Sequence, residues 1–476
     1  MIKFINRIMR NICQMETKEV IVPAQGKIHL TSEEQRFFQD LKQVVEKKGC
    51  GTELRVAGGW VRDKLLGLLS TDIDIALDNM MGEPFARLVM ESIPSIRGLG
   101  TIKANPQASK HLETACARIH GLDIDFVNLR SEDYCEDSRI PSMQIGTPSE
   151  DAHRRDLTIN SLFYNIHKDT IEDFTGNGLQ DLFSRVARTP LPPKQTFLDD
   201  PLRVLRTIRF AARYDLAIAD EIHEAALDPE IVEALCKKVS RERISKEYQL
   251  MMKGNNQIKA LKLLNDYNLL NVIFLLPENM QNLLPDGYEL AVELVPEESP
   301  TDSFYLYTAA ILSQYHNAQE FSVPKKRSFY PLFEHICCES LKLSNNDSKV
   351  ISGILSNLST GMEVLRSQDL VKTGFMIRET KEYWRLVLKL GEAMLGTQGL
   401  KESLTEFITQ SNLQTFYSEK PIVDGGEVKR TVGVNGPDIG KMLQAAISWQ
   451  ILNRNGTKEQ LVEFLIQNKH NITSSS

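Results

Sequence analysis

The stretch GGWVRDKLLGLLSTDIDIAL, residues 58–77, constrains the fold of this chain more than any other. The alternation in LRVA, directly before it, predicts the end of a strand, and VRDKLLGLL has the apolar spacing of a helix. STDIDIAL predicts a second strand, on which Asp72 and Asp74 point to the same face because strand side chains alternate. A strand–turn–helix–strand order is therefore expected, with two carboxylates on one face.

The chemistry of this stretch favours a nucleoside triphosphate site. Two carboxylates on one face repel each other, and a divalent cation such as Mg²⁺, which prefers oxygen ligands, would relieve the repulsion. The turn at Gly58 and Gly59 leaves backbone N–H groups free to bind phosphate. Arg62 follows in the first helical turn and is a candidate phosphate contact. The alternative is a surface ion pair between Arg62 and Asp63.

A third carboxylate is expected from LDIDFVNLR, which begins at Leu122 and predicts another strand. Asp123 and Asp125 share one face of it, and we favour Asp125 as the partner of the first pair. The alternative is a solvated strand face. Between the acidic strands, the segment GLGTIKANPQASKHLETA, residues 98–115, predicts a mobile loop because it is rich in glycine, lysine and small residues.

The patch DAHRRDLTINSLFYN, residues 151–165, predicts contacts to a nucleotide. Arg154 and Arg155 offer bidentate donors for phosphate oxygens, and Asp156 or Asn160 can bind ribose hydroxyls. Alone, such a cluster is more often a charged surface. DFTGNGLQDL follows at residues 173–182 and predicts a glycine turn between a strand and a helix.

A third patch, DDPLRVLRTIRFAARYDL at residues 199–216, predicts a helix that starts near Pro201, with acidic residues just before it. Arg203, Arg206 and Arg209 form a stripe opposite the apolar side of this helix. The stripe suits a triphosphate or an RNA backbone. The alternative is a solvated basic face paired with nearby acids.

In this order the three patches resemble motifs A to D of the class II tRNA nucleotidyltransferases, the CCA-adding enzymes. The matching phrases are GGWVRD with DID, RRDLTIN, the glycine turn and DDPLR, and the wording is nearest to the fungal branch. SRERISKE, residues 240–247, resembles motif E, a helix–turn brace under the site. The resemblance is dense over residues 50–255. Its structural positions are Asp173, Gly178, Asp199, Arg241, Glu242 and Arg243.

The resemblance implies addition of cytidine, cytidine and adenosine to the 3′ end of tRNA from CTP and ATP, without a template. Asp72 and Asp74 then hold Mg²⁺ and activate the tRNA 3′-hydroxyl, with Asp125 as the candidate third catalytic carboxylate. Asp200 and Arg203 recognise the base. The other implied nucleotide-binding residues are Gly58, Gly59, Arg62, Arg154, Arg155, Asp156, Asn160, Arg206 and Arg209.

The resemblance also implies the architecture, an α+β nucleotidyltransferase head with a small mixed sheet followed by all-α neck, body and tail domains. We expect the neck, body and tail to clamp tRNA by shape and phosphate contacts. We also expect the protein to be a monomer. The expected divisions are a tail over 1–30, the catalytic head over 31–176, the neck with the base template over 177–275, and the body and tail over 276–476.

Composition limits the possible partners and cellular location of the protein. The chain has 476 residues and a formal net charge of −7, so RNA binding needs a local basic surface. Seven scattered cysteines without a C-x-x-C favour reduced thiols inside the cell, and no apolar run is long enough for a membrane. The first 15 residues fit a mitochondrial presequence or a frayed terminus. We expect a protein of cytoplasm and nucleus, with mitochondrial targeting of the longest form.

Three alternatives to full CCA addition stay open. The loop over residues 97–110 is compact for the fungal branch, which is compatible with a relative that adds only CC or only the final A. A second alternative is a poly(A) polymerase, which would make long products. The third is a tRNA-binding protein without catalysis, which the intact Asp72 and Asp74 disfavour.

Overall fold

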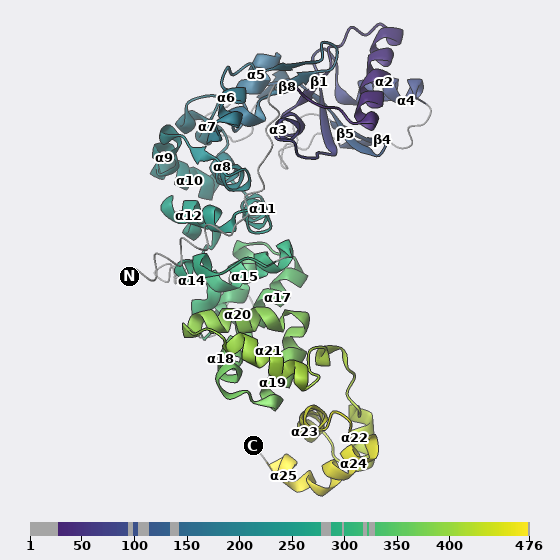
Figure 1. Cartoon of the computed structure of the whole chain (residues 1–476), viewed down its shortest axis with the longest axis vertical. Coiled ribbons are helices and arrows are strands. Elements are labelled where there is room, and N and C mark those ends of the chain that lie inside the picture. Colours follow the sequence, from purple (N-terminus) through teal and green to yellow (C-terminus); the bar gives the residue numbers. More distant parts are fainter. Residues whose placement is uncertain are drawn as a thin grey trace. The chain divides into compact units, whose positions relative to one another are not determined.

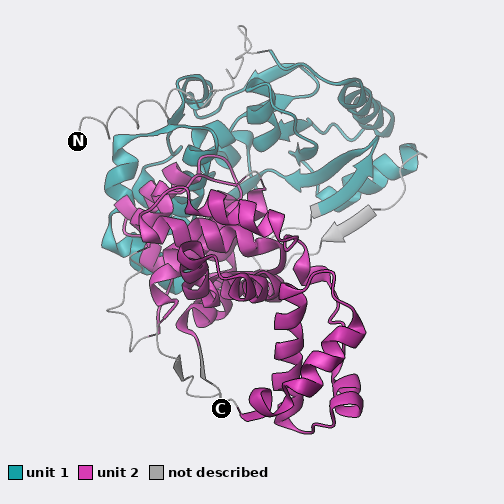
Figure 2. Ribbon diagram, turned by 60° about the horizontal axis from the view of Figure 1, so that its bottom comes forward, with its two compact units in different colours: residues 1–239 teal, residues 240–476 magenta. Residues whose placement is uncertain are grey.

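The computed structural model describes residues 27–93, 99–102, 114–133, 142–277, 287–297, 299–317, 321–322 and 329–474. The chain forms two compact units, residues 1–239 and residues 240–476 (Figure 2). Most of the expected tail over 1–30, including the candidate presequence, lies outside the described residues.

A seven-stranded mixed sheet is the main sheet of the first unit (Figure 1). Its strands run in the order β3-β4-β5-β2-β1-β8-β9; β2 and β5 are parallel and the other neighbours antiparallel. The expected small mixed sheet is thereby confirmed. The strands are β1 (Arg55–Ala57), β2 (Asp72–Leu77), β3 (Leu99–Ile102), β4 (Thr114–Ile119), β5 (Leu122–Asn128), β8 (Phe163–Asn165) and β9 (Thr170–Glu172).

The loop expected over residues 98–115 is wrong in part. Residues 99–102 form strand β3, which pairs antiparallel with β4, and Leu99 lies opposite Ala117. Four residues are too few for an alternating pattern that would predict a strand. β3 is stabilised by its pairing with β4 and not by a strong strand preference of its own residues. Residues 97–98 and 103–113 lie outside the described residues.

Helices contact the sheet and continue beyond it in the first unit. α4 contacts β4 and β5, α2 contacts α4, and α3 lies against β1 and β2. Buried Glu34 ties α2 to α3, because it accepts from Trp60 Nε1 at 3.0 Å and pairs with Lys64 at 2.6 Å. The helices are α2 (Ser32–Lys48), α3 (Gly59–Leu65), α4 (Gly82–Ser92), α5 (Pro148–His153), α6 (Gly178–Phe183), α7 (Pro193–Asp199), α8 (Leu202–Arg213), α9 (Asp220–Ala226), α10 (Pro229–Lys238) and the 3₁₀ turn η2 (Thr158–Asn160).

Short strand pairs lie outside the main sheet, in both units of the chain. β10 and β11 pair in parallel, whereas β6 with β7 and β12 with β13 are antiparallel. Their bounds are β6 (Arg130–Asp133), β7 (Ser142–Ile145), β10 (Val186–Ala187), β11 (Ala217–Ile218), β12 (Phe321–Ser322) and β13 (Phe329–Tyr330).

The second unit is mostly helical, as expected for the part after the head. Its longer-range packing includes α11 against α15 and α18 against α20. The helices before residue 420 are α11 (Arg241–Met252), α12 (Gln257–Asp266), α13 (Leu270–Ile273), α14 (Tyr288–Glu293), α15 (Pro300–Leu312), α16 (Leu332–His335), α17 (Asn345–Ser356), α18 (Leu358–Ser367), α19 (Leu370–Thr380), α20 (Trp384–Leu395) and α21 (Leu400–Gln410).

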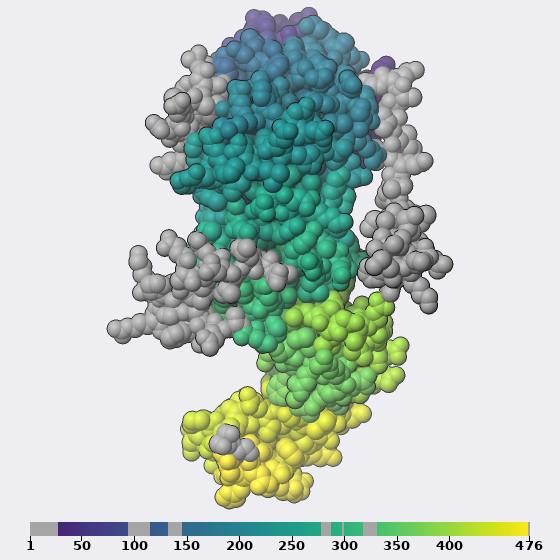
Figure 3. Space-filling model, turned by 90° about the vertical axis from the view of Figure 1, so that its left-hand side faces the viewer, coloured from purple at the N-terminus to yellow at the C-terminus, as the bar shows by residue number. Residues whose placement is uncertain are grey.

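The last four helices, which form the yellow cluster in Figure 3, pack around a core of their own. Buried Val428, Met442 and Leu461 belong to this core, which explains why the segment packs as a group. Among the described residues, no helix is both long and apolar enough to cross a membrane. The helices are α22 (Gly425–Val432), α23 (Pro437–Leu452), α24 (Lys458–Gln467) and α25 (Lys469–Ser474).

Candidate active site

The parallel pair of β2 and β5 brings four carboxylates to one face of the sheet. Asp72 lies opposite Asp123, and Asp74 lies opposite Asp125. Residues that are directly opposite in a sheet point to the same side, so the two expected acidic strand faces are one surface. Asp74 and Asp125 are partly buried, whereas Asp72 and Asp123 are exposed. The intervening Ile73, Ile75, Ile124 and Phe126 are buried on the other side.

The electrostatics of this face favour a bound cation. Burial raises the pKa of Asp74 to about 6; Arg155 opposes this shift, and the negative charges of Asp72 and Asp125 add to it. Burial also raises the pKa of Asp72, together with the charges of Asp125 and Asp123. Both shifts mean that the ionised pair is not neutralised by the protein alone.

The donor set fits Mg²⁺ bound together with a nucleotide. Within the described ranges, no three His, Cys, Asp or Glu side chains converge into a complete metal cage. Mg²⁺ does not need one, since it commonly takes one or two carboxylates and completes its shell with phosphate oxygens and water. Asp72 and Asp74 could hold such an ion, with Asp125 beside them.

The glycine turn makes room for an arginine. Gly58 has φ +68° and its N–H donates to the Leu162 carbonyl at 2.8 Å, so the expectation that this N–H is free to bind phosphate is wrong for Gly58. A Cβ built on Gly58 would lie 2.5 Å from Arg155 Nη1, and that nitrogen donates to the Asn160 carbonyl at 3.1 Å. Gly58 therefore serves two needs: a left-handed backbone and the close approach of the Arg155 guanidinium.

Asp151 is a site residue that the sequence did not single out. It is 1% exposed and pairs with Arg154 at 2.6 Å and Arg155 at 2.7 Å, and it accepts from the Arg130 N–H at 3.1 Å. Burial alone would raise the pKa of Asp151, but the guanidinium groups of Arg155 and Arg154 lower it to about 2. The signal available in the sequence was its position three and four residues before the two arginines, on one helical face.

Arg62 is buried rather than exposed. Its side chain is 5% accessible; Nη2 lies 2.8 Å from Asp63 Oδ1, and Nη1 donates to Asn160 Oδ1. The alternative ion pair between Arg62 and Asp63 is therefore present, but it is buried and not on the surface. Asn160 in turn donates to Asp156 Oδ1 at 2.9 Å, so the first and second sequence patches meet through side chains.

Two of the three arginines of the α8 stripe are buried. Arg203 is 7% and Arg209 is 9% exposed, so the alternative of a solvated basic face does not hold for these two, whereas the Arg206 side chain is 35% exposed. Arg206 Nη2 lies 2.7 Å from Asp156 Oδ2. Burial alone would raise the pKa of Asp156, but the charge of Arg206 and hydrogen bonds from Asn160 and Arg206 lower it to about 2.

The two residues expected to read the base lie where α7 ends and α8 begins. Asp199 is the last residue of α7, and Asp200 Oδ1 accepts from the Leu202 N–H at 3.2 Å. Arg203 Nη1 donates to the Thr196 carbonyl at 3.2 Å. Both side chains are thus fixed by the backbone of this junction.

The third and fifth motifs form turns and helix braces. Asp173 Oδ1 accepts from the Gly176 N–H at 3.1 Å and Oδ2 from the Leu179 N–H at 3.1 Å, which closes the expected glycine turn before Gly178. In the second unit, Arg241 donates to the carbonyls of Val272, Ile273 and Ser340.

These carbonyls belong to segments about 30 and 100 residues further along, so Arg241 fastens α11 to both. On the same helix Glu242 is exposed and Arg243 is partly buried.

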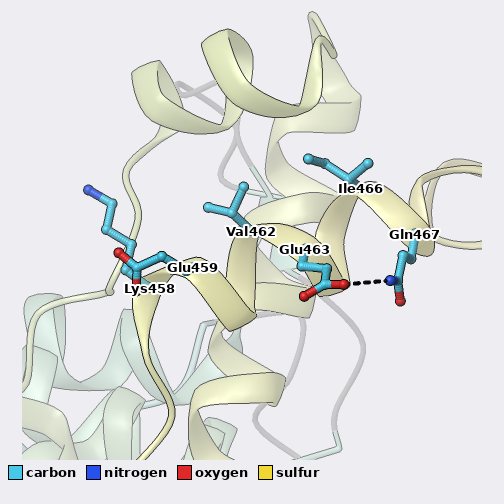
Figure 4. Close-up of a pocket in the computed structure, with 6 residues that line it drawn as sticks. All are labelled: Lys458, Glu459, Val462, Glu463, Ile466 and Gln467. Atoms are coloured by element: carbon cyan, nitrogen blue, oxygen red, sulfur yellow. Dashed lines mark hydrogen bonds between the residues drawn. The ribbon is translucent and has the colours of Figure 1, made fainter.

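A hollow on α24 offers a contrast with this cluster. Its lining comes from one helix and includes none of the predicted site residues, and Glu463 and Gln467 are hydrogen bonded at 3.1 Å within it (Figure 4). The candidate active site is therefore the group of carboxylates and arginines in the first unit and not this hollow. The lining residues are Lys458, Glu459, Val462, Glu463, Ile466 and Gln467.

Comparison with known proteins agrees with this geometry. A family model for the Poly A polymerase head domain matches residues 54–188, which include β1, β2 and β5. The Bacillus stearothermophilus CCA-adding enzyme, solved in complex with CTP, has the same fold, with a TM-score of 0.67 over 94% of this chain and 100% of that chain at 20% identity.

Two curated relatives match almost from end to end. The mitochondrial CCA tRNA nucleotidyltransferase of Saccharomyces cerevisiae is 39% identical over 92% of this chain and 93% of that protein. Its namesake in Candida glabrata is 36% identical over 92% of this chain and 96% of that protein. The chain belongs to the CCA tRNA nucleotidyltransferase family.

Proposed function

We propose that the protein adds C, C and A to the 3′ end of tRNA, using CTP and ATP and no nucleic-acid template. The observation that carries the proposal is the carboxylate face of β2 and β5 beside the arginines held by Asp151. Family membership over nearly the whole chain supports the same substrates.

In each addition the 3′-oxygen of tRNA attacks the α-phosphorus of the nucleotide. A bond forms between that oxygen and phosphorus, the bond between the α- and β-phosphates breaks, and pyrophosphate leaves with the electron pair. The hydroxyl proton passes to the carboxylate face of β2 and β5.

We assign the divalent cation to Asp72 and Asp74 and propose that it is Mg²⁺. When bound, it supplies positive charge for the phosphate oxygens on which negative charge develops. Asp125 is the proposed third carboxylate, because it lies directly opposite Asp74 and is partly buried.

The base is proposed to be read by Asp200 and Arg203. Cytosine and adenine both present an exocyclic amine beside a ring nitrogen acceptor, so an aspartate can accept from the first and an arginine can donate to the second. Uracil and guanine present a carbonyl and an N–H at these places, and both contacts fail. Leaving buried polar groups unpaired in this way can discriminate ~10⁴-fold. Fixing both residues at the junction of α7 and α8 supports this role.

The remaining nucleotide contacts are proposals of the same kind. Gly58 and Gly59 approach the triphosphate with their backbone, and Arg154 lies beside it. Arg155, Asp156 and Asn160 recognise the ribose. Arg62 contacts the triphosphate, and Arg206 and Arg209 line the nucleotide. The structural positions are Asp173, Gly178, Asp199, Arg241, Glu242 and Arg243.

We infer that tRNA is held by the helical regions, the neck over 177–275 and the body and tail over 276–476, while the head over 31–176 does the chemistry. The protein acts as a monomer in this proposal. Mitochondria are its proposed location, supported by the names of both relatives, with cytoplasm and nucleus as further sites for shorter forms.

The test compares carboxylates of the same face by the rate of CTP addition to a tRNA transcript. Asp72→Ala or Asp74→Ala should lower the rate about 10³-fold, and Asp125→Asn about 10-fold or more. Asp123→Asn is the matched control, because its side chain is 65% exposed and pairs with Arg118 at 3.7 Å. Full activity after loss of Asp72 or Asp74 would contradict the metal assignment, and equal effects at 123 and 125 would remove Asp125 from the site.

A further inference from the structure

A closed circuit of side chains in the first unit joins helix α8 to helix α3 and to the 3₁₀ turn η2. Tyr214, which follows the last residue of α8, donates from its hydroxyl to Asp63 Oδ1 at 2.8 Å. The same oxygen accepts from Arg62 Nε at 2.9 Å, and Arg62 donates onward to Asn160.

The circuit then returns to the helix where it began. Asn160 donates to Asp156 Oδ1 at 2.9 Å, and Asp156 Oδ2 pairs with Arg206 of α8 at 2.7 Å. Asp156, Asn160 and Asp63 are 5%, 6% and 8% exposed, so these hydrogen bonds form in an environment of low polarity and hold their groups firmly.

Two aromatic rings cover the guanidinium at the centre of the circuit. The ring of Tyr214 lies 4.4 Å from Arg62 Cζ, and the ring of Phe210 lies 5.1 Å from it. The two rings are stacked, with centroids 6.2 Å apart and planes at 16°. A guanidinium on an aromatic face is attracted by the ring quadrupole, and this attraction grows when water is excluded.

The hydroxyl of Tyr214 stays a donor throughout the physiological range. Burial raises the pKa of Tyr214 to about 12, against the opposing charge of Arg62. Asp63 therefore always receives a hydrogen bond from a neutral phenol and a pair of contacts from Arg62.

We propose that Tyr214 and Phe210 are positioning residues for ribose recognition, which they support by fixing Arg62 and, through it, the pair Asn160 and Asp156. The inference rests on the proposed function, since it assigns the ribose to this pair. Neither ring needs to touch the substrate. The rings of Tyr214 and Phe210 hold Arg62, and Arg206 holds Asp156. The loss of a ring leaves Arg62 free to turn, and Asn160 then loses the partner that orients its amide.

The test measures kcat and KM for CTP and for dCTP with wild type and variants, using tRNA that ends at the discriminator base. Tyr214→Leu should lower the preference for CTP over dCTP about 10-fold, mainly through a higher KM for CTP, with kcat changed less. Tyr214→Phe keeps the ring and loses only the hydroxyl, so it should lower the preference by about 2- to 3-fold. Phe210→Leu should fall between them.

Tyr164→Leu is the matched control, because Tyr164 is also buried in this unit and its hydroxyl donates to an aspartate, Asp169. It should lower the thermal midpoint without changing the preference for CTP over dCTP. The proposal is overturned if Tyr214→Leu and Tyr214→Phe lose stability but keep the wild-type preference. If wild type adds no nucleotide at all, the proposed function fails instead, and the two failures are distinguishable in one assay.

Discussion

Burial and neighbouring carboxylates raise the pKa of Asp74 to about 6, above its ordinary value of 3.8, whereas two arginines close by oppose the shift only in part. Asp151, 77 residues along the chain, shows the opposite case, since two guanidinium groups outweigh its burial and lower its pKa to about 2. These two carboxylates of one unit therefore differ: the protein itself neutralises the charge of buried Asp151, whereas the charge of partly buried Asp74 is not fully neutralised and favours an external cation.

The raised pKa of Asp74 predicts a stability change with a defined sign. Between about pH 4 and pH 6 the folded state binds a proton that the unfolded state has released, so stability falls as pH rises through this window. Asp74→Asn removes the ionised group and should stabilise the metal-free protein by about 1–3 kcal/mol near pH 7.5, a gain that shrinks towards pH 4.

The measurement is urea unfolding in EDTA at several pH values, repeated with Mg²⁺. Mg²⁺ should stabilise wild type and leave Asp74→Asn nearly unchanged, because binding to the folded state alone adds stability. A variant that is less stable than wild type near pH 7.5 in EDTA would contradict the assignment of Asp74 to an unneutralised site.

At the scale of the element, the sequence predicted what local pattern determines. DIDIAL and LDIDFVN alternate cleanly, and both are strands, β2 and β5. Helix α8 begins directly after Pro201, as its start signal indicated. The pattern could not say that Asp74 and Asp125 are opposite each other, because strand order depends on the whole sheet.

The features that the sequence did not predict also depend on contacts between segments far apart in the chain. A helical wheel shows that Arg203 and Arg209 share a side, but it does not show what covers that side, and both are buried. Strand β3 exists through its pairing with β4 rather than through its own residues. Tyr214, whose ring covers Arg62, is a tertiary neighbour that a single motif does not reveal. Asp151, in contrast, is a local partner three and four residues before Arg154 and Arg155, and its spacing was visible in the sequence.

The junction of β1 and α3 supplies a prediction at this scale. Gly58→Ala forces a side chain into the left-handed region and places Cβ 2.5 Å from Arg155 and 3.1 Å from the Asn160 carbonyl. Gly121→Ala is a matched control, since Gly121 has φ +85° in the turn between β4 and β5 with nothing within 4 Å. The control should lose about 1 kcal/mol of unfolding free energy in denaturant titrations, and Gly58→Ala about 2–4 kcal/mol. Equal losses would mean that the approach of Arg155 to Gly58 does not matter.

At the scale of the molecule, the candidate active site and the mostly helical unit occupy different parts of the chain. The carboxylates and the arginines proposed to bind the nucleotide lie in the first unit, and the second is mostly helical, with Arg241 fastening α11 to two distant segments. A formal net charge of −7 does not by itself attract RNA, so specific recognition of tRNA must come from local surface and shape. The central claim is thus that one chain carries both the site and the selectivity for three successive additions.

Nucleotide addition to three tRNA transcripts, ending at the discriminator base, at C and at CC, tests this claim most directly. Each is incubated with Mg²⁺ and with CTP, ATP or both, and products are resolved at single-nucleotide length. We predict that the first transcript gains C, C and A and then stops, and that the CC-ended transcript gains one A. Addition of CC alone, of A only to the CC-ended transcript, or of long A tails would contradict it.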